Sequence, residues 1–190
     1  NYASEIWSLL WKAGNLLGIK AIGFNALNIA RIETGFIVAN SDFITSDHAL
    51  RKDRAKFPDE IGLSWMVDMS KNHFNGKQAI QKARINKENK CVLVGLEIDG
   101  KESAEGSIVY YNKSKEIGMV TAATWSPTAK KSIALASLNR PYGSDIKDNL
   151  WVEIYALREL QYHKLMKRAV IVKTPFVNLN RRTITPPLYR

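Results

Sequence analysis

The fold is decided by the stretch CVLVGLEI at Cys91–Ile98, an apolar run of strand length that the hairpin signal Asp99-Gly100 follows. Further short segments of apolar or alternating character come after it, at residues 107–111, 115–121, 132–138, 150–155 and 169–173. Short strands broken by turn residues are typical of a small antiparallel barrel or sandwich. We therefore predict such a β domain in the second half of the chain.

The first half of the chain favours helices. Residues 2–18 place apolar side chains at helical spacing, and residues 25–34 form a second helical segment that Gly35 ends. A charged segment without periodicity follows at residues 42–54, and we expect it to be exposed.

The segment between the helices and the β domain mixes both kinds of structure. Pro58 interrupts any helix there, residues 63–68 are expected to form a short strand, and residues 77–83 a short helix. The polar residues 87–90 are the expected boundary with the β domain. The predicted fold class is α+β, followed by a small antiparallel β-barrel.

The composition is that of an ordinary globular protein, with 190 residues of which 45% are hydrophobic and 24% charged. The one cysteine, Cys91, is expected to be a small buried hydrophobe, and an unpaired cysteine fits the reducing cytoplasm. No apolar stretch approaches the ~18 residues that span a bilayer, and no secretory signal opens the sequence. The sequence begins at Asn1 without Met, so we expect a fragment or one segment of a longer protein.

The formal net charge of +10 raises the question of a polyanionic partner. The excess is concentrated late, because residues 140–190 hold ten basic side chains against four acidic ones. Such a surface attracts nucleic acid, a polyglutamylated folate, a nucleotide or an acidic protein alike. Without zinc-finger spacing or an aromatic RNA-binding signature, direct nucleic-acid binding is disfavoured.

No residue pattern indicates a metal site or a nucleophile. The histidines His48, His73 and His163 lie in polar, loop-like contexts without acidic residues at ligand spacing on a helix. Neither Gly-x-Ser-x-Gly nor a phosphate-binding glycine loop is present. We therefore predict no metal and name no catalytic residue.

Two places remain as candidate binding sites. Arg31 and Glu33 are separated by about 200° around their helix, so they cannot pair with each other, and one should face a neighbouring element or a ligand. The alternative is that they form two structural ion pairs. Trp125 precedes Ser126-Pro127, a stiff loop that could hold the indole at a pocket mouth against a flat heterocycle. Packing under a turn is the alternative for Trp125.

Several blocks in a fixed order resemble the C-terminal half of the glycine cleavage T-protein (aminomethyltransferase) family. They lie at residues 26–36, 57–65, 74–80 and 117–136, and the match extends from the helix at 7–14 to residues 173–177. The forms Ala26-Leu27-Asn28 and Asp42-Phe43 look closer to the T-protein-like parts of dimethylglycine and sarcosine dehydrogenases than to the bacterial T-protein.

This resemblance implies the C-terminal portion of a folate-binding domain at residues 1–86, the family's C-terminal β-barrel at 90–178 and an extended tail at 179–190. It also implies transfer of a one-carbon unit from a small amine donor to tetrahydrofolate. We expect Arg31, Glu33 and Trp125 to line one cleft for the reduced pteridine, with Arg31 in the family's Arg-x-Glu-x-Gly block.

Two departures from the family pattern bear on function. The family's essential Asp lies in its N-terminal half, which this sequence does not contain, so the catalytic acid should come from that missing half. Classical members have Arg then Asp where this chain has Leu27 and Asn28, and that Arg contacts the pterin. The alternatives are a non-catalytic folate-holding or scaffold module of a larger flavin dehydrogenase, a relative that demethylates a sulfonium compound, and, third, a nucleic-acid binder.

Overall fold

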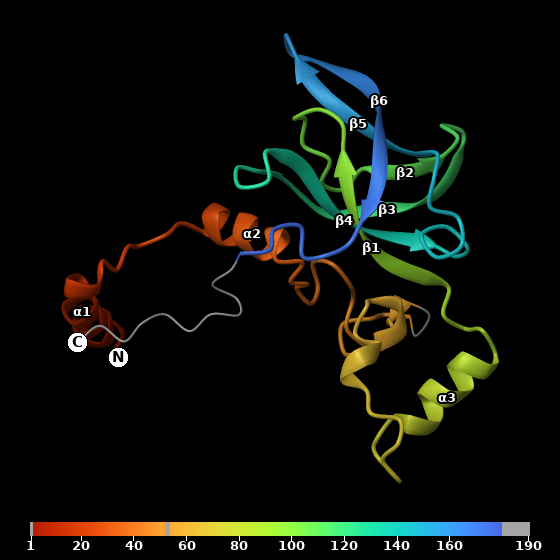
Figure 1. Cartoon of the computed structure of the whole chain (residues 1–190), viewed down its shortest axis with the longest axis horizontal. Coiled ribbons are helices and arrows are strands. Elements are labelled where there is room, and N and C mark those ends of the chain that lie inside the picture. Colours follow the sequence, from red (N-terminus) through yellow and green to blue (C-terminus); the bar gives the residue numbers. More distant parts are fainter. Residues whose placement is uncertain (1, 52–53, 180–190) are drawn as a thin grey trace.

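The computed structural model describes residues 2–51 and 54–179. Within them, six antiparallel strands close into a barrel in the order β1-β4-β3-β2-β5-β6 (Figure 1). The strands are β1 Cys91–Ile98, β2 Ile108–Tyr111, β3 Lys115–Ser126, β4 Lys131–Asn139, β5 Leu150–Arg158 and β6 Gln161–Val172. The predicted fold class, α+β with a small antiparallel barrel, is confirmed. The tail expected at 179–190 lies, beyond Leu179, outside the described residues.

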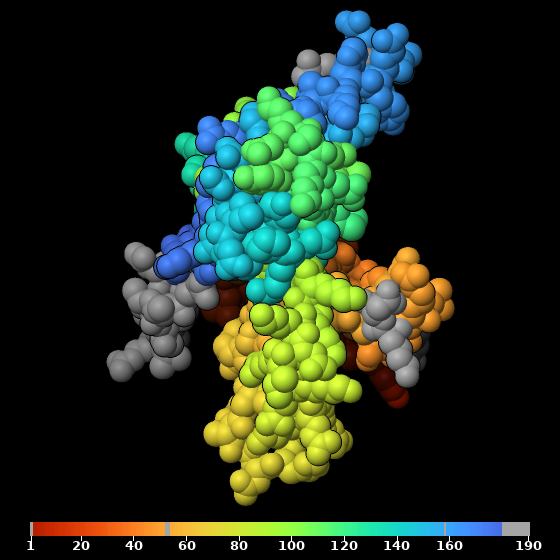
Figure 2. All heavy atoms as spheres, turned by 90° about the vertical axis from the view of Figure 1, so that its right-hand side faces the viewer, coloured from red at the N-terminus to blue at the C-terminus, as the bar shows by residue number. Residues whose placement is uncertain are grey.

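The strand pairings correct two local expectations. Asp99-Gly100 does not make a hairpin, because β1 pairs with β4 and β6 whereas β2 pairs with β3 and β5. A turn signal reverses the chain but does not choose the strand partner. In addition, β6 begins at Gln161, well before the expected start at residue 169, because it pairs along the whole of β5. This β5–β6 hairpin projects from the barrel at the top of Figure 2.

The barrel interior holds the main core, which alternate strand residues fill. Its fully buried members include Leu96, Val109, Val120, Leu138 and Val152. Cys91 is buried as predicted, and burial raises the pKa of its thiol. A second, smaller cluster on the outside of the barrel packs Ile32 against Ala122 of β3 and Ile133 of β4. This cluster is what seats the second helix on the barrel.

The first two helices form where their periodicity predicts. Helix α1 spans Ala3–Gly14 and continues as the 3-10 turn η1, Asn15–Leu17, while α2 spans Phe24–Glu33. Gly35 ends α2 with a φ of 70°, and a Cβ at this glycine would lie 2.7 Å from the Cβ of Thr174. Glycine is therefore needed here both for its backbone conformation and for the close approach of the returning C-terminal segment.

The strand expected at residues 63–68 is wrong. Ser64–Met66 forms the 3-10 turn η4, in which Met66 N–H donates to the Leu63 carbonyl at 3.0 Å and Val67 N–H to the Ser64 carbonyl at 3.1 Å. These backbone groups are satisfied locally instead of in a sheet ladder. The short helix was correctly expected, and as α3 it spans Lys77–Ile85.

A buried carboxylate joins this connecting segment to the barrel. Glu60, in the 3-10 turn η3 Pro58–Glu60, accepts backbone N–H bonds from Lys90 at 3.1 Å and Cys91 at 3.2 Å through Oε1. Its Oε2 accepts the N–H of Phe57 at 3.0 Å. The start of β1 is therefore fastened to the segment that precedes α3. No helix among the described residues has the length and apolar character to cross a membrane.

Candidate functional site

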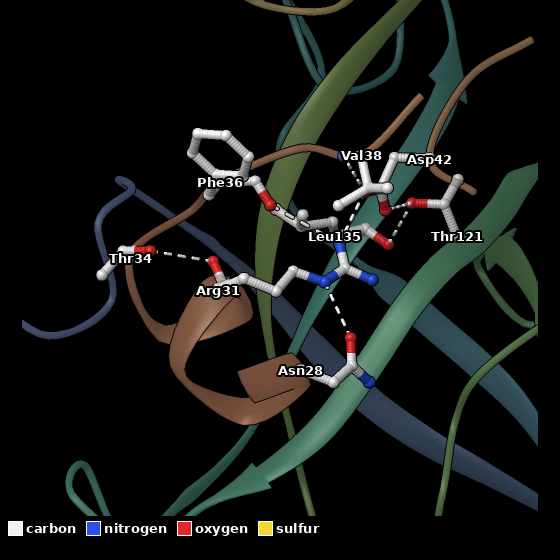
Figure 3. A network of polar contacts seen from close by, with 8 residues as sticks. All are labelled: Asn28, Arg31, Thr34, Phe36, Val38, Asp42, Thr121 and Leu135. Carbon is white, nitrogen blue, oxygen red and sulfur yellow. Dashed lines mark hydrogen bonds and ion pairs between the residues drawn. The ribbon is translucent and has the colours of Figure 1, made fainter. Parts of the chain in front are cut away.

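A network of hydrogen bonds surrounds Arg31, in the last turn of α2 (Figure 3). Its Nη1 donates to Oδ2 of Asp42 at 2.5 Å, and its Nε donates to Oδ1 of Asn28 at 2.8 Å. The Asp42 side chain is fully buried and that of Arg31 is 12% exposed. The segment 42–54 was expected to be exposed, but its first residue, Asp42, is buried. The positive charge of Arg31 makes this burial possible.

Asp42 is itself held by groups other than Arg31. Its Oδ2 accepts the backbone N–H of Val38 at 2.8 Å, and its Oδ1 accepts the hydroxyl of Thr121 on β3 at 2.9 Å. The Thr121 hydroxyl also lies 3.2 Å from the carbonyl oxygen of Leu135 on β4. One carboxylate therefore joins α2, the loop that follows it and the barrel wall. An ion pair fixed this way has a defined geometry.

Beside this network lies a hollow of about 460 Å³, which we call the Arg31 hollow. Its apolar walls are Phe24, Leu27, Phe36 and Val38, and its polar lining is Asn28, Arg31, Ser41 and Glu105. The bonds to Asp42 and Asn28 use Nη1 and Nε, and Figure 3 draws no contact to the second terminal nitrogen within the described residues shown. Apolar walls with a few polar groups are the usual lining of a small-molecule site.

Glu33 points to the barrel instead of to this hollow. Its Oε1 accepts the hydroxyl of Ser126, the last residue of β3, at 2.6 Å, and lies 3.4 Å from the backbone N of Thr128. Ser126 is fully buried, and its Oγ accepts the N–H of Ala129 at 2.9 Å. As expected from their helical spacing, Arg31 and Glu33 have different partners. Both side chains bind protein groups that fasten α2 to the barrel.

Trp125 lies in β3, not in a loop, because β3 continues to Ser126 before the chain turns. Trp125 is 37% exposed, and the Nζ of Lys101 lies 5.0 Å from the centroid of its ring. It lines a different hollow, of about 390 Å³, together with Lys101 and Lys130. Arg31 and Trp125 therefore do not line one hollow among the described residues. A contact of Trp125 with folate stays a prediction.

A larger hollow, of about 630 Å³, was not predicted from the sequence. It lies between the end of α2, the 3-10 turn η4 and the β1–β4 face, and it shares Phe36 with the Arg31 hollow. Trp65 lines it while 80% of its surface is exposed. The sequence offered Trp65 as a signal, because a large aromatic side chain often lines a binding pocket.

The other reactive groups do not form a site. No group of three or more His, Cys, Asp or Glu side chains in the described part of the chain could hold a metal ion. His48 bonds to its neighbour Asp47 at 2.9 Å, with both side chains exposed. Cys91 is buried with a raised pKa, which disfavours the reactive thiolate.

Comparison with known proteins points in one direction. Residues 92–178 match the family model described as the glycine cleavage T-protein C-terminal barrel domain. An aminomethyltransferase of Thermotoga neapolitana is 37% identical over 139 residues, which are 73% of this chain and 35% of that protein. One of Chlorobium limicola is 32% identical over 176 residues, 92% of this chain and 43% of that protein.

A solved structure shares the fold. The crystal structure of glycine cleavage system aminomethyltransferase T from Bartonella henselae matches with a TM-score of 0.66 at 21% sequence identity. The match covers 87% of this chain and 42% of that one. The chain thus spans about two fifths of the length of these relatives.

Proposed function

Because this chain belongs to the glycine cleavage T-protein (aminomethyltransferase) family, we propose that it is the C-terminal part of a tetrahydrofolate-dependent one-carbon transferase. The resemblance read from the sequence blocks is confirmed at the level of the family. The proposed reaction moves a one-carbon unit from a small amine donor to tetrahydrofolate. The buried, single cysteine agrees with a reducing compartment such as the cytoplasm.

The observation that carries this proposal is the Arg31 hollow. Phe24 and Phe36 supply apolar surface of the kind that a planar ring system buries, while Arg31 and Asn28 supply donors for an oxo group. Glu105 supplies a carboxylate for amino and ring N–H groups. These residue types fit a reduced pteridine, which has an apolar body and donors and acceptors at one end.

In this proposal the residues of this chain bind and orient, and they do not perform the proton transfer. One-carbon transfer to a folate amine requires a carboxylate that orients that amine or handles its proton. We assign this carboxylate to the N-terminal part of the fold, because the family's essential Asp belongs there. Asp42 is unsuited to the task, since its oxygens are already occupied by Arg31, the N–H of Val38 and the hydroxyl of Thr121 on β3.

Glu33 and Trp125, the other two residues predicted to bind folate, have different roles in the proposal. Glu33 supports the site indirectly, because its bond to Ser126 holds the helix that carries Arg31. Trp125 lies at a separate hollow, which does not favour its contact with the same ring. A Trp125→Ala variant that weakens tetrahydrofolate binding would restore it to the site.

The test is calorimetric titration of tetrahydrofolate into the protein that contains both the N-terminal part and this chain. The informative variant is Leu27→Glu, since it places a second carboxylate in the hollow without touching the Arg31–Asp42 pair. Met119→Glu is the matched control, because Met119 on β3 is 51% exposed and Leu27 is 53% exposed. We expect saturable binding that Leu27→Glu weakens at least about tenfold, a change of about 1.4 kcal/mol, and that Met119→Glu leaves unchanged. No binding to the unmutated protein would refute the proposal.

A second candidate function is a folate-holding module without transfer activity, and Leu27 favours it. Leu27 lines the hollow at the position where classical members place an arginine that contacts the pterin. The loss of that cation could leave a site that holds folate in an unreactive position. Binding of tetrahydrofolate without its conversion, across a panel of amine donors, would support this candidate over the transferase.

A further inference from the structure

A cluster of charged side chains lies where α3 and the segment after it meet the barrel. It surrounds a hollow of about 470 Å³, which we call the cationic hollow. Every described residue that lines it is polar: Asp59, Ser64, Arg84, Lys87, Asn89 and Arg140. None of these residues lines the Arg31 hollow or the hollow of about 630 Å³. The cationic hollow is therefore separate from the site proposed for folate.

The lining comes from three parts of the chain, which are the 3-10 turns before α3, the end of α3 with the segment after it, and the residue after β4. The backbone N–H of Arg140 donates to the carbonyl oxygen of Lys90 at 2.9 Å, which holds the β4–β5 connection beside the segment after α3. Figure 2 shows this connection directly above that segment. Basic residues often end a helix because they complement its carbonyl groups. That reason does not explain Arg140, which belongs to another element.

A carboxylate sets the orientation of Arg84. The Oδ2 of Asp59 accepts the Nε of Arg84 at 2.6 Å, and its Oδ1 accepts Nη2 at 2.8 Å. The Asp59 side chain is only 13% exposed, so this pair has a defined geometry. These two bonds leave Nη1 and the second hydrogen of Nη2 available, because a guanidinium has five N–H groups.

Other polar groups at the hollow lack partners. Neither the Lys87 ammonium nor the Arg140 guanidinium forms an ion pair or hydrogen bond with another described residue. The Nδ2 of Asn89 lies 3.4 Å from Oδ2 of Asp59, but its buried Oδ1 has no hydrogen-bond partner in the described part of the chain. Buried polar atoms without partners are rare, because they cost free energy. The hollow thus offers donors, and one acceptor, that protein groups leave unsatisfied.

The charges at the hollow favour phosphate over other anions. The three cations and the single carboxylate of the lining leave a net charge of +2. A phosphate monoester carries about −1.5 to −2 charges at pH 7 and has three terminal oxygens, so it can neutralise this charge and accept from all three cations. A carboxylate carries one charge and two oxygens, which would leave a cation unpaired. Arginine also binds phosphate through two parallel N–H bonds.

We propose that the cationic hollow binds the phosphate group of a small molecule. Arg84, which Asp59 orients, donates to the phosphate oxygens together with Lys87 and Arg140. A water or hydroxyl group beside the phosphate supplies the donor that Oδ1 of Asn89 lacks. The volume of the hollow lies in the range of small-molecule sites.

The test is calorimetric titration of the protein that contains both the N-terminal part and this chain, in a buffer without phosphate. The probes are inorganic phosphate and glycerol 3-phosphate, which is a phosphate monoester with hydroxyl groups. We expect both to bind saturably, with one phosphate per chain. A monoester that binds more tightly than inorganic phosphate would identify an organic phosphate as the occupant. A monoester that binds no more tightly would identify free phosphate, and either result supports a phosphate site.

Two matched variants test the location. Arg140→Gln removes a guanidinium from the hollow, and Arg168→Gln removes one from β6. Both residues are exposed, so both variants keep the barrel core. Arg140→Gln should weaken phosphate binding at least about tenfold, because it removes charge-assisted hydrogen bonds, and Arg168→Gln should leave it unchanged. Neither should change the affinity for tetrahydrofolate, since neither residue lines the Arg31 hollow.

Four results would overturn the proposal. The first two are the absence of saturable phosphate binding and equal weakening by both variants, which would reduce the effect to overall charge. The third is a loss of tetrahydrofolate affinity in Arg140→Gln, which would assign the hollow to the carboxylates of folate. The fourth is duplex DNA that binds more tightly than either probe and loses its affinity in Arg140→Gln, which would assign it to nucleic acid. A failure of the proposed function would appear separately, as a protein that binds phosphate but not tetrahydrofolate.

Discussion

Replacing Asp42 with Asn should destabilise this chain more than any other single isosteric change near the Arg31 hollow. The carboxylate serves donors on both of its oxygens, from Arg31 and Val38 on Oδ2 and from Thr121 on Oδ1. An amide has one oxygen and an NH₂ group, so one of these donors would face another donor. The positive charge of Arg31 would meanwhile lose its fully buried partner.

The size of the effect follows from the burial of the pair. Removing one partner of a buried ion pair costs about 3–5 kcal/mol. Because 12% of the Arg31 side chain remains exposed to water, we expect the lower end, about 3 kcal/mol. For a chain of this length 1 kcal/mol shifts the melting temperature by about 2–4 °C, so the melting temperature should fall by about 6–12 °C.

Two further variants separate the charge from the packing. Thr121→Val removes a single hydroxyl bond to Asp42 and should cost about 1 kcal/mol. Arg31→Leu combined with Asp42→Leu removes the pair as a whole and should recover part of the lost stability, because apolar residues often replace buried ion pairs without loss. The recovery is incomplete because the N–H of Val38 and the hydroxyl of Thr121 lose Asp42 as their acceptor. This double variant should still fail to bind tetrahydrofolate, since the donors of Arg31 are absent.

Urea unfolding of the 190-residue chain measures the differences in the free energy of unfolding, and scanning calorimetry measures the shifts in melting temperature. The reasoning is refuted if Asp42→Asn lies within about 0.5 kcal/mol of the unmutated chain, the range of ordinary surface substitutions. It is also refuted if the effects of Arg31→Leu and Asp42→Leu simply add, because residues in direct contact should show a coupling energy.

The other predictions use the same protein. Leu27→Arg restores the residue of classical family members at the hollow, and it should tighten tetrahydrofolate binding about tenfold in calorimetry. Met119→Arg should leave the affinity unchanged. Equal affinities of the two variants for tetrahydrofolate would contradict our placement of the site. Hydrogen bonds from Arg84 hold the pKa of Asp59 below its usual 3.8, so this carboxylate stabilises the fold above that pH and the contribution is lost as pH falls through the folded-state pKa. Arg84→Leu should therefore flatten the fall of stability below about pH 4 in urea titrations, and an unchanged pH profile would show that the pair is energetically silent. Burial raises the pKa of Cys91, so a thiol reagent at neutral pH should label it only after unfolding, and rapid labelling of the folded chain would contradict its position in β1.

Much of the local structure was predictable because its signals are local. Helix α2 follows from its apolar spacing and the glycine at its end, and α3 was placed to within two residues of its observed end. The strands from Cys91 onward follow from apolar runs between turn residues. Local signals failed where a distant partner decided the outcome, as in β6, whose polar first residues pair with β5. The strand predicted at residues 63–68 is absent for a different reason. This apolar run pairs with no strand of the barrel, and Ser64–Met66 forms a 3-10 turn with local hydrogen bonds.

The candidate site shows the same division more sharply. Arg31 could be singled out because a cation on a mostly apolar helix needs partners, but its partner could not be named. Asp42 sits in a charged stretch that reads as solvent-exposed, and its bond to Thr121 joins residues 79 positions apart. Trp125 was singled out for its chemistry, and only its place on β3 shows that it borders a separate hollow.

By itself the amino-acid sequence determined the family, the fold class and the residues whose chemistry needed explaining. Periodicity, turn residues and motif order are properties of neighbouring positions, so they can be read along the chain. The tertiary structure decided which charges neutralise each other, which hollow each side chain borders and which cations meet at one hollow. These depend on which faces meet when distant segments pack, because burial and hydrogen-bond pairing are properties of the folded arrangement and not of any one stretch.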